Sequence, residues 1–232
     1  MFCCLFVYLK LYRLNSIDSK SQLIFIFSTL TLFAVIIGLY VEYTNWSVFM
    51  IPCAMLAIAY RIFLDSRTAF MAYLVFVLAT SIAVSMPYEY ILLQTGTGLV
   101  AIYTLKELSQ RSQILRTTFM IFLTYSLIWI SIQMIQLESL ENIDLKMFIY
   151  FAINSILLLL IYPLLFVVEK LFGFISNVTL IELSNINNPL LRQLAENAPG
   201  TFQHSMQVST LAAEAANYVG ANVQLVRTAA LY

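Results

Sequence analysis

The chain has 232 residues, of which 61% are hydrophobic and 10% are charged, and its mean hydropathy is +0.87. Soluble domains are about 45–50% apolar and about 25% charged, so most of this chain belongs in lipid rather than in a water-exposed globule. The formal net charge is zero, which argues against binding to a nucleic acid polymer by bulk electrostatics.

Seven apolar segments follow one another along the first 168 residues. The first, residues 1–9, is too short to cross a bilayer, and its positive charges follow it, unlike those of a secretory signal. We interpret it as part of a first span. The other six reach the length of about 17–25 residues that a membrane helix needs. They are residues 23–41, 46–64, 68–86, 88–105, 117–136 and 147–168. The expected fold is therefore all-α, a polytopic membrane domain with six full spans and a partial first one.

Charges between the segments predict how the spans are oriented. If the first segment ends in the cytoplasm, the inner connections carry Lys10, Arg13, Lys20, Arg61, Arg67, Lys106, Arg111 and Arg116. The outer connections then carry Glu42, Glu89, Glu138, Glu141 and Asp144, with Lys146 as their only cation. This asymmetry satisfies the positive-inside rule and places the C-terminal tail in the cytoplasm.

Few polar residues lie inside the spans, and no span centre holds an ionisable residue, which disfavours a transporter. We expect the polar residues to form hydrogen bonds between helices; they are Gln94, Thr95, Thr97, Gln133, Asn154 and Ser155. The small residues of QTGTG at 94–98 should let two helices approach closely, and Pro163 should kink the last span.

The apolar region also contains aromatic residues and cysteines whose positions allow a prediction. Trp46, Tyr88 and Tyr90 fall at outer ends of spans, where amphipathic rings are expected at the headgroup level. The cysteines lie in apolar stretches without ligand partners nearby, so we assign them neither a disulfide nor a metal site. They are Cys3, Cys4 and Cys53.

Past residue 170 the sequence becomes polar. The cluster SNINNP at 184–189 predicts a turn, and APG at 198–200 predicts a break. Thr201 is then a suitable N-cap for a helix that ends at Gly220, and a second helix should begin near Asn222. We divide the chain into a membrane domain at 1–168, a cytoplasmic connector at 169–198 and the start of a further helical domain at 199–232.

His204 is the only histidine, and it lies on the helix predicted after Thr201. Helical spacing places it on one face with Val208, Leu211, Ala215 and Tyr218, which we expect to be the buried face. The residues leave two interpretations open. A histidine at the edge of a core is the one that geometry favours; the other is the first ligand of a metal site whose further ligands lie elsewhere.

One stretch carries a specific resemblance. LIELSNINNPLLRQLAENAPGTFQHSMQVSTLA, residues 180–212, is similar to the junction of the bacterial seven-transmembrane HD-domain receptors. RIFLDSRTA at 61–69 and ELSQRSQILRT at 107–117 resemble cytoplasmic loops of the same membrane domain. The resemblance implies a multi-pass protein of the bacterial inner membrane, with residues 199–232 as the start of an all-α HD phosphohydrolase domain.

The resemblance also implies an activity. Characterised members of that family are metal-dependent phosphodiesterases that open cyclic di-AMP to the linear dinucleotide. By residue match, His204 would be the first ligand of a two-metal centre, with iron or manganese expected. The implied partners are the lipid bilayer and, for the complete protein, cyclic di-AMP; a homo-oligomer is left open.

The sequence also departs from the family pattern, because the His-Asp pair and the later ligands of the family do not occur in it. We therefore expect a piece of a longer protein, truncated at both ends and inactive alone, and we assign no catalytic or cofactor-binding residue. The alternative is a membrane sensor or scaffold module without chemistry.

Overall fold

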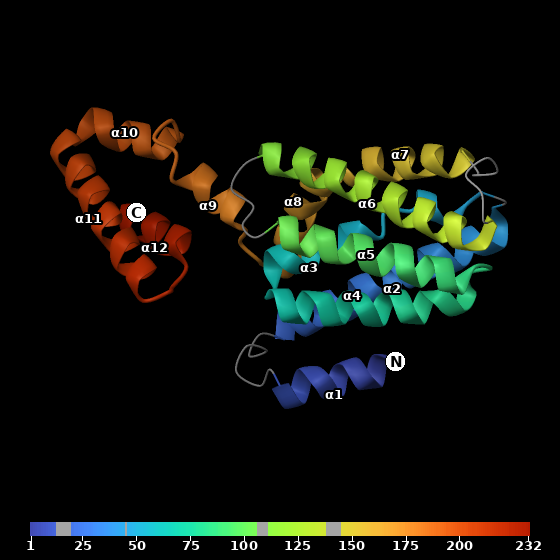
Figure 1. The fold of residues 1–232 in the computed structure, drawn as a ribbon. Helices are drawn as coiled ribbons and strands as arrows, with labels where there is room; N and C mark the ends of the chain where they lie inside the picture. Colours follow the sequence, from blue (N-terminus) through green and yellow to red (C-terminus); the bar gives the residue numbers. More distant parts are fainter. Residues whose placement is uncertain (13–19, 45, 106–110, 138–144) are drawn as a thin grey trace. The chain divides into compact units, whose positions relative to one another are not determined.

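The computed structural model describes residues 1–12, 20–44, 46–105, 111–137 and 145–232 (Figure 1). These residues form twelve α-helices and two short 3-10 helices, so the expectation of an all-α fold is confirmed for the part described. The chain divides into two compact units, the first ending at Phe174 and the second running from Ile175 to Tyr232.

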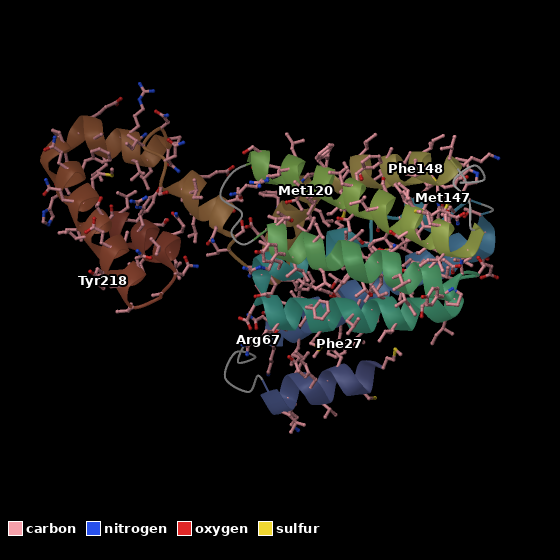
Figure 2. The ribbon with its side chains drawn as sticks, viewed as in Figure 1. Phe27, Arg67, Met120, Met147, Phe148 and Tyr218 are labelled. Atoms are coloured by element: carbon pink, nitrogen blue, oxygen red, sulfur yellow. The ribbon has the colours of Figure 1, made fainter. Side chains whose placement is uncertain are left out.

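The first unit is a bundle of helices. Its α-helices are α1 (Phe2–Tyr12), α2 (Lys20–Tyr43), α3 (Ala54–Phe63), α4 (Ser66–Thr80), α5 (Pro87–Thr104), α6 (Arg111–Leu137), α7 (Lys146–Leu158) and α8 (Ile161–Phe172). The 3-10 helices are η1 (Val48–Met50) and η2 (Ser81–Ala83). Helix α4 packs against α2, α3 and α5, and α6 packs against α5 and α7. Phe27 lies on the side of the bundle that faces α1, and its ring centroid is 6.4 Å from that of Phe6 (Figure 2).

Three stretches of the described chain are long and apolar enough to cross a membrane by themselves. They are Lys20–Tyr43, Ser66–Ala83 and Ser112–Gln136, and the pair α7 and α8 makes a fourth if the two count as one bent span. The chain is thus a multi-pass membrane protein. Helix α5 and the 46–64 stretch are not among them, so the described chain has three or four of the six expected full spans by length and apolarity.

The stretch predicted as one span at 46–64 is broken in two. Ser47 caps η1, with its Oγ accepting from the Phe49 N–H at 3.4 Å, and α3 begins only at Ala54. Pro52 lies in the break, where its ring and missing N–H interrupt a helical ladder. As a result α3 is ten residues long.

The bend expected from Pro163 is confirmed. Helices α7 and α8 meet at 45°. At the bend the N–H groups of Leu159 and Leu160 donate to Ile156 and Leu157, three residues back rather than four. The bend lies four residues before Pro163, where the proline ring excludes the carbonyl of Leu159 from a normal helical turn.

Cationic residues gather at one end of the bundle. The last residues of α1, α3, α5 and α8 lie at this end, with the first residues of α2, α4 and α6 (Figure 1). The predicted inner residues that belong to these helices are Lys10, Lys20, Arg61, Arg67 and Arg116, and Arg67 is labelled at this end in Figure 2. The predicted residues Arg13, Lys106, Glu138, Glu141 and Asp144 lie outside the described residues, as do the side chains of Cys4 and Arg111.

The second unit consists of four helices: α9 (Asn177–Leu183), α10 (Pro189–Asn197), α11 (Pro199–Tyr218) and α12 (Val223–Leu231). The turn predicted at 184–189 is confirmed, because α9 ends at Leu183 and Asn188 caps α10 by accepting from the Leu190 N–H at 3.1 Å. Helix α12 packs on both α9 and α11, and the Thr228 Oγ1 donates to the Leu180 carbonyl at 3.1 Å.

Candidate functional site

The helix that carries His204 has well-defined ends. It begins at Pro199 rather than after the predicted cap Thr201, because proline at the first helical position lacks only an N–H that would be unpaired anyway. The expected end at Gly220 is confirmed: Gly220 has φ +71°, and the Ala221 N–H donates to the Ala216 carbonyl at 2.8 Å. Asn222 then caps α12, as expected for a second helix near this residue.

The face of α11 that carries His204 is exposed, which corrects the expectation of a buried face. Val208 is 40%, Leu211 66% and Tyr218, labelled in Figure 2, 96% exposed, and His204 and Ala215 are exposed as well. The buried residues of α11 are Ser209, Ala213 and Ala216. Small side chains let α11 approach α10 and α12, whereas the sequence prediction assigned burial to the larger apolar residues.

The described part of the chain places no group of metal-binding side chains around His204. Among the residues described, no group of three or more histidine, cysteine, aspartate or glutamate side chains is placed to hold a metal ion. A metal site needs several such ligands at defined distances, so the described residues offer one imidazole on a helix rather than a complete centre.

A second group of polar residues lies inside the membrane unit and is centred on Gln94. The Oε1 atom of Gln94 accepts from the hydroxyls of Tyr125 at 2.9 Å and Tyr73 at 3.2 Å. All three residues are fully buried, and they belong to α5, α6 and α4. The predicted interhelical role of Gln94 is therefore confirmed. The two tyrosines were not predicted, because a tyrosine in an apolar segment looks like any other core aromatic.

Asn154 makes a further long-range polar contact in the membrane unit. Its Nδ2 donates to the carbonyls of Phe49 and Ile51, each at 2.8 Å. These carbonyls lie at the break before α3. The Ile51 carbonyl also accepts from the Cys53 N–H at 2.8 Å, and α7 supplies the donor for the Phe49 carbonyl, which the interrupted helix lacks. The expectation for Asn154 is confirmed.

Of the remaining polar residues of the spans, Thr95, Gln133 and Ser155 form no hydrogen bond between helices among the described residues. Thr97 donates to the carbonyl of Leu93 in its own helix at 2.8 Å. The hydroxyls of Thr95 and Ser155 are buried without a partner among the described residues, and Gln133 is half-buried. The Thr97 hydroxyl also interacts with the hydroxyls of Tyr73 and Tyr125, which belong to the neighbouring helices α4 and α6, as the interhelical expectation for Thr97 requires.

One of the aromatic residues expected at the headgroup level is instead buried. Trp46 and Tyr88 are 65% and 66% exposed, but Tyr90 is fully buried. Its hydroxyl lies 3.1 Å from the Thr80 Oγ1 and 3.7 Å from the Sγ of Cys53, which is also buried. Two positions along α5 separate Tyr88 from Tyr90, so the pair points to different sides of the helix.

Close packing around QTGTG is confirmed at both of its glycines. A Cβ atom added at Gly98 would meet the ring of Tyr73 on α4, and one added at Gly96 would meet the Cδ1 of Ile128 on α6. Helix α5 therefore approaches a neighbour on either side through a glycine. The polar groups of this region are neutral, and their arrangement serves to hold helices together.

Comparison with known proteins gives a family match over most of the chain. The family model described as 7TM receptor with intracellular HD hydrolase matches residues 1–176. The chain is 32% identical over 229 residues to the cyclic-di-AMP phosphodiesterase PgpH of Listeria monocytogenes, covering 92% of this chain and 31% of that protein. It is 27% identical over 249 residues to the protein of the same name from Bacillus subtilis, covering 100% of this chain and 34% of that protein.

A third relative is an uncharacterized protein of Synechocystis, which is 53% identical over 64 residues, 28% of this chain and 8% of that protein. No solved structure matches the chain. The chain spans about a third of the length of the two phosphodiesterases that it matches.

Proposed function

Because this chain belongs to the family of seven-transmembrane receptors with an intracellular HD hydrolase, we propose that it is the membrane portion of a cyclic di-AMP phosphodiesterase. The observation that carries the proposal is the similarity to two proteins named for that activity, which covers 92% and 100% of this chain. The complete protein would open cyclic di-AMP to the linear dinucleotide.

The proposed topology keeps six full spans and a partial first one. In this topology α1 is the partial span. The six full spans are the four stretches named above, the pair of η1 and α3, and helix α5. The gathering of Lys10, Lys20, Arg61, Arg67 and Arg116 at one end of the bundle supports a cytoplasmic location for that end. Because α8 ends there as well, the tail that follows would lie in the cytoplasm of a bacterial cell, beneath the inner membrane.

The proposed domains are the membrane domain at 1–168, the connector at 169–198 and the start of the HD domain at 199–232. The exposed row of Val208, Leu211 and Tyr218 on α11 supports this assignment of the last segment. Apolar side chains in a row on a helix outside the spans favour a surface on which more protein packs. In relatives about three times as long as this chain, there is polypeptide to supply it.

His204 is proposed as the first ligand of the two-metal centre, with iron or manganese as the metal. Its place near the start of α11 fixes the backbone from which the imidazole extends, and the other ligands would come from polypeptide that this sequence does not include. When bound, a pair of such metals activates water and stabilises the leaving oxygen of a phosphodiester. Since the described residues offer one ligand, the chain alone is expected to be inactive. That same observation favours the alternative function, a sensor or scaffold module without chemistry.

Replacement of His204 in the intact protein tests the proposal. We expect His204→Ala to abolish hydrolysis of cyclic di-AMP and to lower the bound metal, with membrane insertion unchanged. Gln207→Ala is the matched control, because Gln207 is an exposed residue of the same helix, and it should keep the wild-type rate. Wild-type turnover in His204→Ala would show that His204 is not a ligand. Metal-dependent turnover by the purified 232-residue chain would contradict its expected inactivity.

A further inference from the structure

The ring of Phe25 lies at the centre of an aromatic cluster near the cationic end of the bundle. Phe25 is fully buried in the first turns of α2. Its ring centroid lies 5.6 Å from Tyr60 and 5.7 Å from Phe63 on α3, and 5.1 Å from Phe172 and 5.4 Å from Phe174. All four pairs have edge-to-face geometry, with interplanar angles of 69° to 86°, which is a favourable arrangement for aromatic rings.

Two of these rings belong to the segment through which the chain leaves the first unit. Phe172 is the last residue of α8, and Phe174 is the last residue of the first unit. Gly173 between them has φ +71°, a left-handed conformation that only glycine adopts without cost. The two flanking rings stack, 6.0 Å apart at 18°, and Phe174 also lies 5.2 Å from Phe63.

The helices that hold these rings are themselves joined at the same level. The hydroxyl of Tyr60 on α3 lies 2.9 Å from the Thr29 Oγ1 and donates to the Ile26 carbonyl at 3.3 Å. Both partners belong to α2. The Tyr60 side chain therefore links α3 to α2 next to Phe25, and Phe172 and Phe174 pack against the rings at this link.

We propose that this Phe25 cluster (Phe25, Tyr60, Phe63, Phe172 and Phe174) is a clamp that couples α2 and α3 to the start of the second unit. The next residue, Ile175, begins that unit and is 61% exposed. Phe172 and Phe174 are held by rings of α2 and α3. A change in the spacing of these two helices therefore moves Phe174, the residue after which the second unit begins. The inference concerns movement within this chain and does not rest on the proposed catalytic function.

Proteolysis of the full chain in lipid nanodiscs tests the clamp. Chymotrypsin cleaves after aromatic residues, and rings held in the cluster should protect the bonds after Phe172 and Phe174. We expect Phe25→Ala to be cleaved there at least about tenfold faster, which corresponds to a loss of about 1.4 kcal/mol of ring contacts. Phe33→Ala is the matched control, because Phe33 is on the same helix and pairs with Phe76 instead. It should be cleaved at the wild-type rate.

A second variant tests the clamp without removing a ring. An alanine Cβ at Gly173 would meet nothing within 4 Å, so Gly173→Ala acts only through its left-handed backbone. It should also raise cleavage after Phe172 or Phe174. Gly220→Ala, which has the same φ of +71° and equally open surroundings in the second unit, should leave that cleavage unchanged. If Phe25→Ala does not fold, Gly173→Ala decides the matter.

A distance measurement tests the coupling directly. Spin labels at Tyr88→Cys and Ile175→Cys, both exposed positions, can be introduced after Cys3 and Cys4 are replaced by serine, since the buried Cys53 is shielded from the reagent. We expect one narrow distance distribution in the otherwise unchanged chain and a broader one with Phe25→Ala or Gly173→Ala. A broad distribution before either change, unchanged cleavage in both variants, or equally fast cleavage in Phe33→Ala would each overturn the proposal.

Discussion

Gly98 of α5 lies so close to the ring of Tyr73 of α4 that no side chain fits between them. The ring is held in place, because Tyr73 is fully buried and its hydroxyl proton is shared between the backbone oxygen and the Oε1 of Gln94, each at 3.2 Å. The contact joins a backbone to a side chain across two helices of the bundle. It makes the spacing of α4 and α5 depend on a single missing methyl group.

Alanine at Gly98 should therefore destabilise the bundle. We expect Gly98→Ala to lower the free energy of unfolding by about 1–3 kcal/mol, because overpacking forces a shift of helix or ring. Thermal unfolding in detergent measures the effect. The control is Gly38→Ala, where the new Cβ meets nothing within 4 Å and should be neutral or slightly stabilising. Equal stability of the two variants would show that α4 and α5 are farther apart than the structure has them.

Removal of the Asn154 amide should loosen the segment before α3. Asn154→Leu leaves the Phe49 carbonyl buried without its donor and the Ile51 carbonyl with only the Cys53 N–H, so we expect a loss of about 1–3 kcal/mol. Ser155→Ala is the control: the Ser155 hydroxyl is buried but has no partner among the described residues, and its removal should cost little. The unfolding free energies of both variants decide the point, and a Ser155→Ala loss as large as that of Asn154→Leu would contradict it.

In the second unit, Thr228→Val should weaken the contact between α12 and α9. The change keeps the side-chain shape but removes the hydroxyl, whose proton is shared between the Leu180 carbonyl at 3.1 Å and the Gln224 carbonyl of its own helix at 2.8 Å, at a cost of about 1 kcal/mol. Hydrogen exchange of the α9 amides should then become faster. Thr210→Val is the matched control, because the exposed Thr210 donates only to Met206 of its own helix. Unchanged exchange in α9 would mean that the Thr228 bond does not hold it.

The exposure of the His204 face makes a separate stability prediction. In the 232-residue chain, His204→Ala should change the unfolding free energy by less than about 0.5 kcal/mol, since a surface substitution removes little packing. Ala216→Leu, on the buried face of the same helix, should cost about 1–3 kcal/mol. Comparable losses in the two variants would indicate that the His204 face is buried in the isolated chain.

Features set by neighbouring residues were predictable from the sequence. The apolar segments, the turn at 184–189, the helix end at Gly220 and the bend before Pro163 all follow from short stretches of chain. The same holds for the uneven distribution of positive charge among the connections. Each depends on local backbone chemistry or on composition, which neighbouring residues carry with them.

Features that depend on which surfaces meet were not predictable. The high apolarity of residues 46–64 concealed the break at Pro52. The carbonyls of Phe49 and Ile51 beside this break accept from Asn154, about a hundred positions away. Tyr73 and Tyr125 became partners of Gln94 only once three helices had packed together.

The candidate site shows the same division. Spacing along α11 correctly places His204, Leu211 and Tyr218 on one face, because the helical period is a local property. Which face is buried depends on the neighbours, and α10 and α12 pack on the small residues Ser209, Ala213 and Ala216. The sequence by itself determined the apolar segments, the charge asymmetry of their connections and the helix that carries the histidine. Only the tertiary structure decided which helix faces are buried against one another, because close packing depends on the shape of side chains as well as on their apolarity.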